Sequence, residues 1–179
     1  MIRKNDLESL VNRYGLGYQY EKANEQYKTP PETEERRQEK KKSNKNQPQR
    51  LLLTWLVEHP EMYQYIRAYI GADDFIEPLY HSVAIMLFEQ LDNEEKINPA
   101  AILSRFTDAE EQKEIAAIFN THLKYGLSSE DEDKALSDVV RKVKLASIED
   151  EMVHTSDIVR WQELLSLKNK MQKFSISRS

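Results

Sequence analysis

The most acidic stretch of the chain, Glu130-Asp131-Glu132-Asp133, has the carboxylates that a metal site needs. A calcium loop spreads its ligands over about twelve residues and turns at a glycine, and this stretch has neither feature. Ser129, three residues before Glu132, instead fits a capping box, in which side chains satisfy the first backbone N–H groups of a helix. The acidic run therefore predicts the start of a helix and not a metal site.

Histidines are the next candidates for acid–base or metal chemistry, and the chain has four of them: His59, His81, His122 and His154. They lie far apart in the sequence, and no HxxxH or HExxH pair occurs, so nothing predicts a catalytic metal. His154, Ser156 and Asp157 are the residue types of a hydrolytic triad. Neighbours within one turn cannot take up the opposed geometry that a proton relay needs, so we reject a triad here.

Two residue counts exclude further chemistries. The chain has no cysteine, which rules out disulfides, zinc ribbons, iron–sulfur clusters and thiol nucleophiles. Its four glycines form neither a GxxxxGK loop nor a GxGxxG fingerprint, so nucleotide binding by these devices is excluded. No set of residues suggests an enzyme.

A local basic cluster follows three glutamates and consists of Arg36, Arg37, Lys40, Lys41 and Lys42. The formal net charge is -5, which argues against the whole chain coating a polyanion. No aromatic residue is interleaved with the cluster to stack bases. We interpret the cluster as a solvated spacer, and a weak, salt-sensitive contact with nucleic acid stays open as the alternative.

A large aromatic residue stands out near the end of the sequence. Trp161 lies in an apolar row with Ile158, Leu165 and Met171 on the last predicted helix. Tryptophan and methionine on a thin element are typical of a binding hot spot, whereas the same helical spacing also fits ordinary core packing. Both interpretations stay open from the residues alone.

The elements that carry these residues are predicted to be helices throughout. Apolar residues recur at intervals of three and four, and no alternating stretch predicts a strand. We expect helices at 48–58, 60–71, 78–92, 98–106, 107–126, 130–153 and 158–174, bounded by proline, glycine or capping residues. The predicted fold class is all-α, a compact helical bundle followed by a C-terminal helical hairpin.

The domain organisation follows from shifts in composition along the 179 residues. Residues 1–27 predict a short helical segment, and residues 28–49 are charged, proline-containing and poor in apolar residues, which predicts a flexible linker. The bundle is expected at 50–146, the hairpin at 147–174 and a disordered tail at 175–179. The longest apolar run, 51–57, is too short to span a membrane and no signal peptide is evident, so we expect a cytoplasmic protein.

Three motifs occur in order across the bundle: RLLLTWL with HPE at 50–61, DDFIEPLY at 73–80 and NPAAIL at 98–103. In order and spacing they resemble the C-terminal helicase-binding domain of bacterial replicative DNA primase, over about residues 50–174. The N-terminal domain of the replicative helicase has a similar fold and a related D-F-x-x-P-x-H turn. Tyr80 stands where that histidine would be, and the hairpin after the bundle also favours primase.

The resemblance implies a non-catalytic module that docks on the N-terminal collar of the hexameric replicative DNA helicase and modulates its ATPase and unwinding activity. It implies a role in the primosome, where RNA primer synthesis begins DNA replication at the bacterial replication fork. Zinc and magnesium would belong to the zinc-binding and polymerase domains of primase, so no cofactor is expected in this chain, and residues 1–27 would be the end of the polymerase domain. The free module is expected to be monomeric. Carried over by position, the helicase contact would fall on the hairpin residues Ile148, Met152, Ile158, Trp161, Leu165 and Met171.

Overall fold

A computed structural model describes residues 34–93, 96–123 and 128–176, with side chains described from residue 46 onward. The chain divides into two units, residues 1–42 and 43–179. The segment predicted as a short helix at 1–27 lies outside the described residues.

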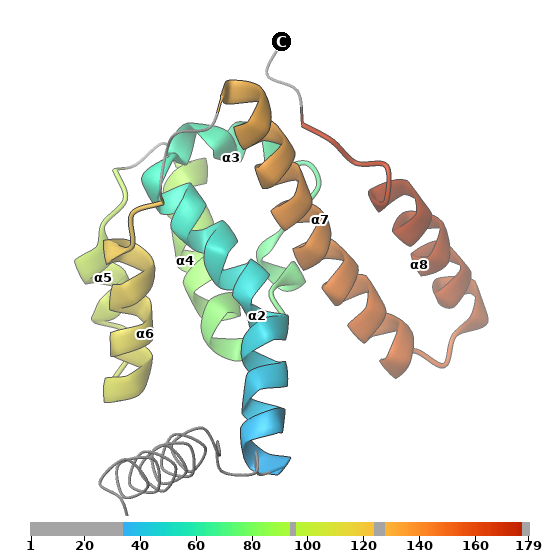
Figure 1. Cartoon of the computed structure of the whole chain (residues 1–179), viewed down its shortest axis with the longest axis horizontal. Helices are drawn as coiled ribbons and strands as arrows, with labels where there is room; N and C mark the ends of the chain where they lie inside the picture. Colours follow the sequence, from blue (N-terminus) through green and yellow to red (C-terminus); the bar gives the residue numbers. More distant parts are fainter. Residues whose placement is uncertain (1–33, 94–95, 124–127, 177–179) are drawn as a thin grey trace, which may run out of the picture. The chain divides into compact units, whose positions relative to one another are not determined.

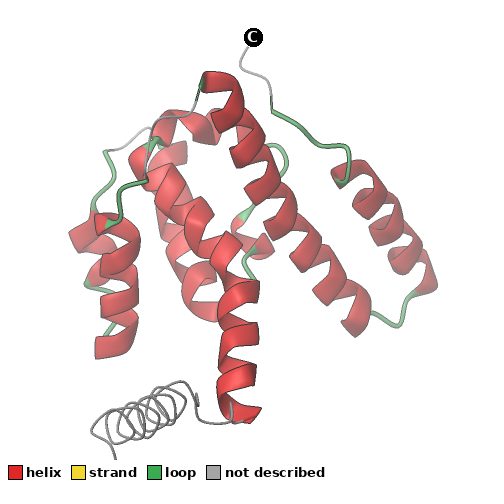
Figure 2. Ribbon diagram, viewed as in Figure 1, coloured by secondary structure: helices red, strands yellow, loops and turns green. Residues whose placement is uncertain are grey.

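Every regular element in the described ranges is a helix, which confirms the all-α prediction (Figure 2). In chain order these are α2 (Glu34–Glu58), η1 (Pro60–Met62), α3 (Tyr63–Ile66), η2 (Ala72–Asp74), α4 (Pro78–Asp92), α5 (Pro99–Leu103), α6 (Ala109–Asn120), α7 (Ser129–His154) and α8 (Ile158–Met171). A helical bundle is followed by a hairpin of α7 and α8 (Figure 1). Among the described helices, none combines the length and the apolar character needed to cross a membrane.

The main core lies where α2, α4, α6 and α7 meet. Its fully buried side chains include Leu52 and Leu56 of α2, Leu87 of α4, Ile115 of α6 and Val140 of α7. Burial of each such side chain stabilises the fold by about 1.5–3 kcal/mol. The apolar rows that the sequence predicts for these helices therefore build one continuous core.

The predicted flexible linker at 28–49 is wrong from residue 34 onward, because α2 begins at Glu34 and continues through Pro48. Glutamate, arginine, glutamine and lysine are good helix formers, so this stretch forms a helix without an apolar face. Asn46 and Gln49 also bind the bundle, because the Asn46 amide donates to the Glu77 carboxylate at 2.6 Å and Gln49 Oε1 accepts from the Glu77 N–H at 3.1 Å. The folded part thus begins before Arg50, where the apolar pattern starts.

The DDFIEP turn connects the bundle to α7 through a nearly buried ion pair. Lys144 Nζ of α7 lies 2.9 Å from both carboxylate oxygens of Asp74, and the Gly71 N–H donates to the same carboxylate. Phe75 is 2% exposed and anchors the turn in the core. The turn therefore fixes the direction in which α7 leaves the bundle.

A second, smaller core fills the space between α7 and α8. Its buried residues are Ile148, Leu164 and Met171, and Leu145, Met152, Leu167 and Phe174 pack around them. Since α7 is one unbroken helix from Ser129 to His154, the predicted boundary between bundle and hairpin falls inside a helix. The hairpin extends from the bundle as a continuation of α7.

The ends of α4, α5, α7 and α8 agree with the predictions within a few residues. The helix expected at 60–71 is instead the short 3-10 turn η1 followed by α3, which ends at Ile66, and α6 ends at Asn120, before the expected end at 126. α4 has its predicted bounds, and Asn98 Oδ1 caps α5 by accepting from the Ala101 N–H at 3.1 Å. Asp108 caps α6, one residue after the start expected for the helix at 107–126, and Ser128 caps α7, one residue before the predicted Ser129. The prediction of a disordered tail at 175–179 is wrong at Ile176, because the Ile176 N–H donates to Ser137 Oγ at 2.7 Å. Residues 177–179 lie outside the described ranges.

Candidate docking surface

The α8 stripe, by which we mean Ile158, Trp161 and Leu165, lies on the outside of the hairpin. The exposed fractions of these residues are 73%, 41% and 38%. Their spacing of three and four residues places them along one side of α8. The structure thus brings three of the six predicted contact residues together on one exposed surface.

The other three predicted residues face inward to different degrees. Ile148 and Met171 are 2% and 4% exposed, because they fill the small core between α7 and α8, and Met152 is half-buried beside them. Including Ile148 and Met171 in a contact surface is therefore wrong for this structure: they hold the hairpin together. The predicted contact thus combined residues from both the inner and the outer side of the hairpin.

Two further exposed apolar residues lie near the tip of the hairpin and were not predicted. Val153, near the end of α7, is 81% exposed, and Val159, in the first turn of α8, is 65% exposed. The signal was present in the sequence, because Leu164 and Met171 are seven residues apart and mark the packed side of α8. Val159 falls off that side and belongs to the exposed tip.

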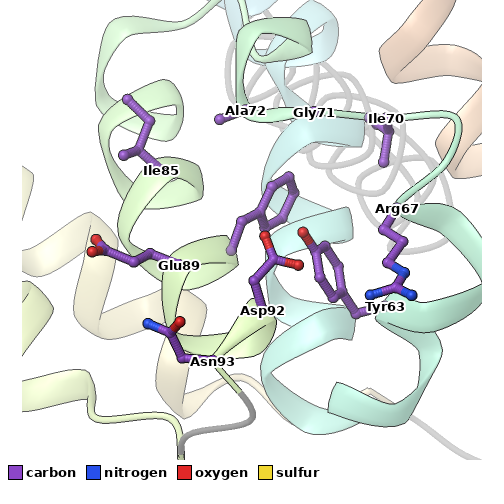
Figure 3. Close-up of a pocket in the computed structure, with 10 residues that line it drawn as sticks. Tyr63, Arg67, Ile70, Gly71, Ala72, Ile85, Glu89, Asp92 and Asn93 are labelled. Atoms are coloured by element: carbon purple, nitrogen blue, oxygen red, sulfur yellow. The ribbon is translucent and has the colours of Figure 1, made fainter.

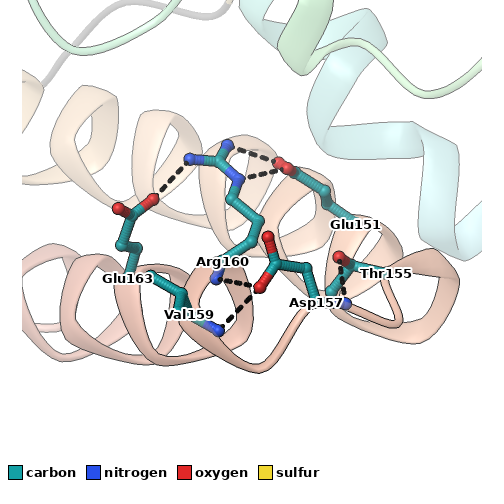
Figure 4. Close-up of polar contacts among 6 residues, drawn as sticks. All are labelled: Glu151, Thr155, Asp157, Val159, Arg160 and Glu163. Atoms are coloured by element: carbon teal, nitrogen blue, oxygen red, sulfur yellow. Dashed lines mark hydrogen bonds and ion pairs between the residues drawn. The ribbon is translucent and has the colours of Figure 1, made fainter.

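The start of α8 is fixed by the turn that precedes it (Figure 4). Asp157 caps the helix, since its Oδ1 accepts from the N–H groups of Val159 at 2.8 Å and Arg160 at 3.4 Å. The Asp157 N–H in turn donates to Thr155 Oγ1. These local bonds explain why the helix begins four residues after the end of α7.

Arg160 joins the two helices at the tip of the hairpin (Figure 4). Its Nε and Nη2 donate to both carboxylate oxygens of Glu151 on α7, at 2.6 and 3.1 Å, and its Nη1 donates to Glu163. The hydrogen bond from Arg160 lowers the pKa of Glu151, and the bonds to both glutamates raise the pKa of Arg160. A two-bond guanidinium–carboxylate pair sets geometry as well as attraction, so it aligns the first turn of α8 with α7.

The bundle has a groove between α3 and α4 (Figure 3). It has a cavity volume of about 460 Å³, with the side chains of Ile70 and Phe88 among its lining and Arg67 and Glu89 contributing charges. Burial and a hydrogen bond to Asp92 raise the pKa of Tyr63 to about 12. The Tyr63 hydroxyl therefore stays protonated near neutral pH and is not a base.

The histidine and carboxylate side chains that were candidates for chemistry cap helices or form contacts along one helix. His154 interacts with the backbone oxygen of Asp150, while Asp157 caps α8, so these two side chains do not meet as a triad requires. Glu130 pairs with Lys134 on the surface of α7. Within the described ranges, no three histidine or carboxylate side chains gather as metal ligands would.

The basic cluster lies in the first half of α2, a helix that begins at Glu34. The side chains of Arg36, Arg37, Lys40, Lys41 and Lys42 are outside what the structure describes. The nucleic-acid contact proposed for them remains a prediction.

Comparison of the chain with models of protein families, with curated proteins and with solved structures found no match.

Proposed function

We propose that this chain is a non-catalytic docking module that binds the N-terminal collar of the hexameric replicative helicase during priming of bacterial DNA replication. The observation that carries the proposal is the α8 stripe, an apolar surface on a hairpin whose inner side is already filled. The proposed site of action is the replication fork in the cytoplasm. No cofactor in this chain is needed for it.

The form of the stripe favours a protein partner. Apolar side chains three and four residues apart on a helix fit the groove of another helical surface. Trp161 lies in the middle of the stripe, and tryptophan is enriched among the residues that dominate binding energy. Gln162 and Asn169 follow Ile158 and Leu165 by four residues, so these exposed polar side chains lie next to the stripe and would form the rim of such an interface.

The choice of helicase as partner is supported by the resemblance to the primase domain. Asp74 of the DDFIEP turn, one of the motifs that carry the resemblance, pairs with Lys144 of α7. The motif therefore lies where the hairpin leaves the bundle. A module of this kind would link the helicase ring, through α7, to the bundle. Contact of the bundle with the helicase would then modulate ATPase and unwinding activity.

A titration of the helicase N-terminal domain with Trp161→Ala tests the proposal. Truncation of a central anchor is expected to weaken the complex by more than about 1 kcal/mol, or about fivefold in Kd, with the helical circular dichroism unchanged. Ser166→Ala, at an exposed position of α8 that lies five residues after Trp161 and so off the stripe, is the matched control and should bind normally.

Ile85→Ala is a second comparison, because Ile85 is 47% exposed in the groove between α3 and α4. Normal binding by Trp161→Ala would refute the stripe as the docking surface. Loss of binding in Ile85→Ala alone would place the contact on the groove. ATP turnover by the hexamer, measured with and without the chain, tests the modulating role.

Two other functions stay as alternatives. The chain would be the N-terminal domain of a helicase if it assembled into dimers or rings by itself. It would be a nucleic-acid-binding adaptor if affinity for DNA depended on Arg36, Arg37, Lys40, Lys41 and Lys42 and fell steeply with salt. No described side-chain contact favours either of them.

A further inference from the structure

The segment after α8 returns to the bundle. We call residues 172–176 the strap. The backbone carbonyl of Phe174 accepts from Arg141 Nη2 at 3.4 Å, and the Ile176 N–H donates to the buried Ser137 Oγ at 2.7 Å. In Figure 1 the chain beyond α8 runs back beside the first half of α7. The strap therefore attaches the far end of α8 to the part of α7 that lies in the bundle.

Phe174 connects the two cores of the molecule. It packs against the main core and also against the small core of the hairpin. Its ring lies 4.7 Å, centroid to centroid, from the ring of Tyr69, which follows α3. Ile176, two residues after Phe174, also packs against the main core. Phe174 and Ile176 are thus the side chains by which the strap holds the bundle.

α8 has a limited packing surface of its own. Its main packing partner is α7, and Leu164 and Met171 are its buried residues. The first six residues, 158–163, are all exposed. Leu167 is partly buried beside Leu164 and Met171, and Lys168 Nζ pairs with Glu149 of α7 at 2.9 Å. A helix held through a small set of side chains gains part of its order from the attachments at its ends, which here are the Arg160 pair at the tip and the strap at the base.

We propose that the strap, through Phe174 and Ile176, is the positioning element that fixes α8 relative to the bundle and so sets where the α8 stripe is presented. The benefit for docking rests on the proposed function, whereas the positioning itself does not. If α8 already has one fixed position in the free chain, binding of a partner to the stripe costs less conformational entropy than it would for a mobile α8. Release of the strap would keep the stripe residues and lose their fixed placement.

Distances within the free full-length chain test the positioning. The chain has no cysteine, so Gln162→Cys on α8 and Lys113→Cys on α6 give two unique sites for spin labels. We expect one narrow distance distribution in this labelled chain and a broad one when Phe174→Ala is added. Lys173→Ala, an exposed residue of the strap, should leave the distribution narrow. An unchanged distribution in Phe174→Ala would overturn the proposal.

Ser137→Ala keeps the test decisive if Phe174→Ala disturbs the bundle itself. This variant removes the acceptor of the Ile176 N–H and keeps a small side chain in the buried position. It should also broaden the distribution, with the circular dichroism unchanged. A narrow distribution in Ser137→Ala, together with an unfolded Phe174→Ala, would show that the residues serve stability alone and would overturn the proposal.

Titration of the helicase N-terminal domain with unlabelled chains tests the consequence for docking. Phe174→Ala should bind several-fold more weakly, although it leaves the α8 stripe intact, and Lys173→Ala should bind normally. Broad distances with unchanged affinity would overturn the docking consequence. If the unmodified chain does not bind the helicase, the proposed function fails while the distance result still decides the strap.

Discussion

Lys144 and Asp74 form the ion pair on which the connection between turn and hairpin depends. Their side chains are only 20% and 10% exposed, and Asp74 also accepts from the Gly71 backbone. Water cannot replace a lost partner fully at such a site, so a charge left alone there is costly. This pair should therefore contribute more to stability than the exposed ion pairs of α7, such as Lys142 with Asp138.

Lys144→Ala is expected to lower the free energy of unfolding by about 3 kcal/mol, because it leaves the Asp74 carboxylate nearly buried without its cation. Urea unfolding followed by circular dichroism measures the change. Lys142→Ala removes the more exposed pair with Asp138 on the same helix and should cost at most about 1 kcal/mol. Equal effects of the two variants would contradict the assignment.

Two tyrosines make stability depend on alkaline pH. Burial and a hydrogen bond to Asp92 raise the pKa of Tyr63 to about 12, and burial with a bond to Glu114 raises the pKa of Tyr80 further. A pKa raised by folding contributes stability that is complete below the unfolded value, about 10, and is lost as the pH rises toward the folded value. The fold should therefore weaken from about pH 10 upward.

Phenylalanine variants test this pH dependence. Tyr63→Phe and Tyr80→Phe should each reduce the loss in unfolding free energy between pH 8 and pH 11, since neither side chain can then ionise in the unfolded state. The measurement is urea unfolding at a series of pH values. Tyr65→Phe, at an exposed position, is the comparison. A pH profile that stays parallel to the unmodified protein in both variants would disprove the contribution.

α8 depends on its first turn because its exposed half has no core beneath it. Asp157→Ala removes the acceptor for the Val159 and Arg160 N–H groups and should cost the helix about 1 kcal/mol. Hydrogen exchange at these two amides should become faster, and helicase binding should weaken. Ser156→Ala, at the exposed neighbour, should change neither. Unchanged exchange in Asp157→Ala would rule out the cap.

The elements were largely predictable from the sequence, since apolar spacing and capping residues placed α4, α5, α7 and α8 within a few residues. The beginning of α2 was not, because a charged helix without an apolar face has the composition of a linker. The ion pair between Lys144 and Asp74 could not be predicted either, since residues 70 positions apart in the sequence give no local signal of contact.

The candidate site was half predictable for a similar reason. Helical spacing placed Trp161 and Ile158 on one side of α8, as the exposed stripe has them. Spacing alone does not tell which apolar residues face the neighbouring arm, so Ile148 and Met171 were assigned to the surface and Val153 and Val159 were missed. That distinction depends on how the two arms pack.

The whole molecule is proposed to be a monomer that finds its partner through the hairpin. Sedimentation of the free chain should give a single species near 21.1 kDa over a range of concentrations. Larger species would form if the α8 stripes of two chains packed against each other. A dimer or ring would favour the alternative of a helicase N-terminal domain, and Trp161→Ala would show whether the stripe holds that assembly together.

The bundle and the hairpin each contain one tryptophan side chain. Trp55 is 8% exposed in the main core, Trp161 is 41% exposed on α8, and the sequence has no other tryptophan. Their fluorescence should differ, with blue-shifted emission from Trp55 and red-shifted, readily quenched emission from Trp161. A ligand that covers the hairpin would shield Trp161 from acrylamide and leave Trp55 unaffected. Natural fluorescence can therefore locate binding on this chain without a label.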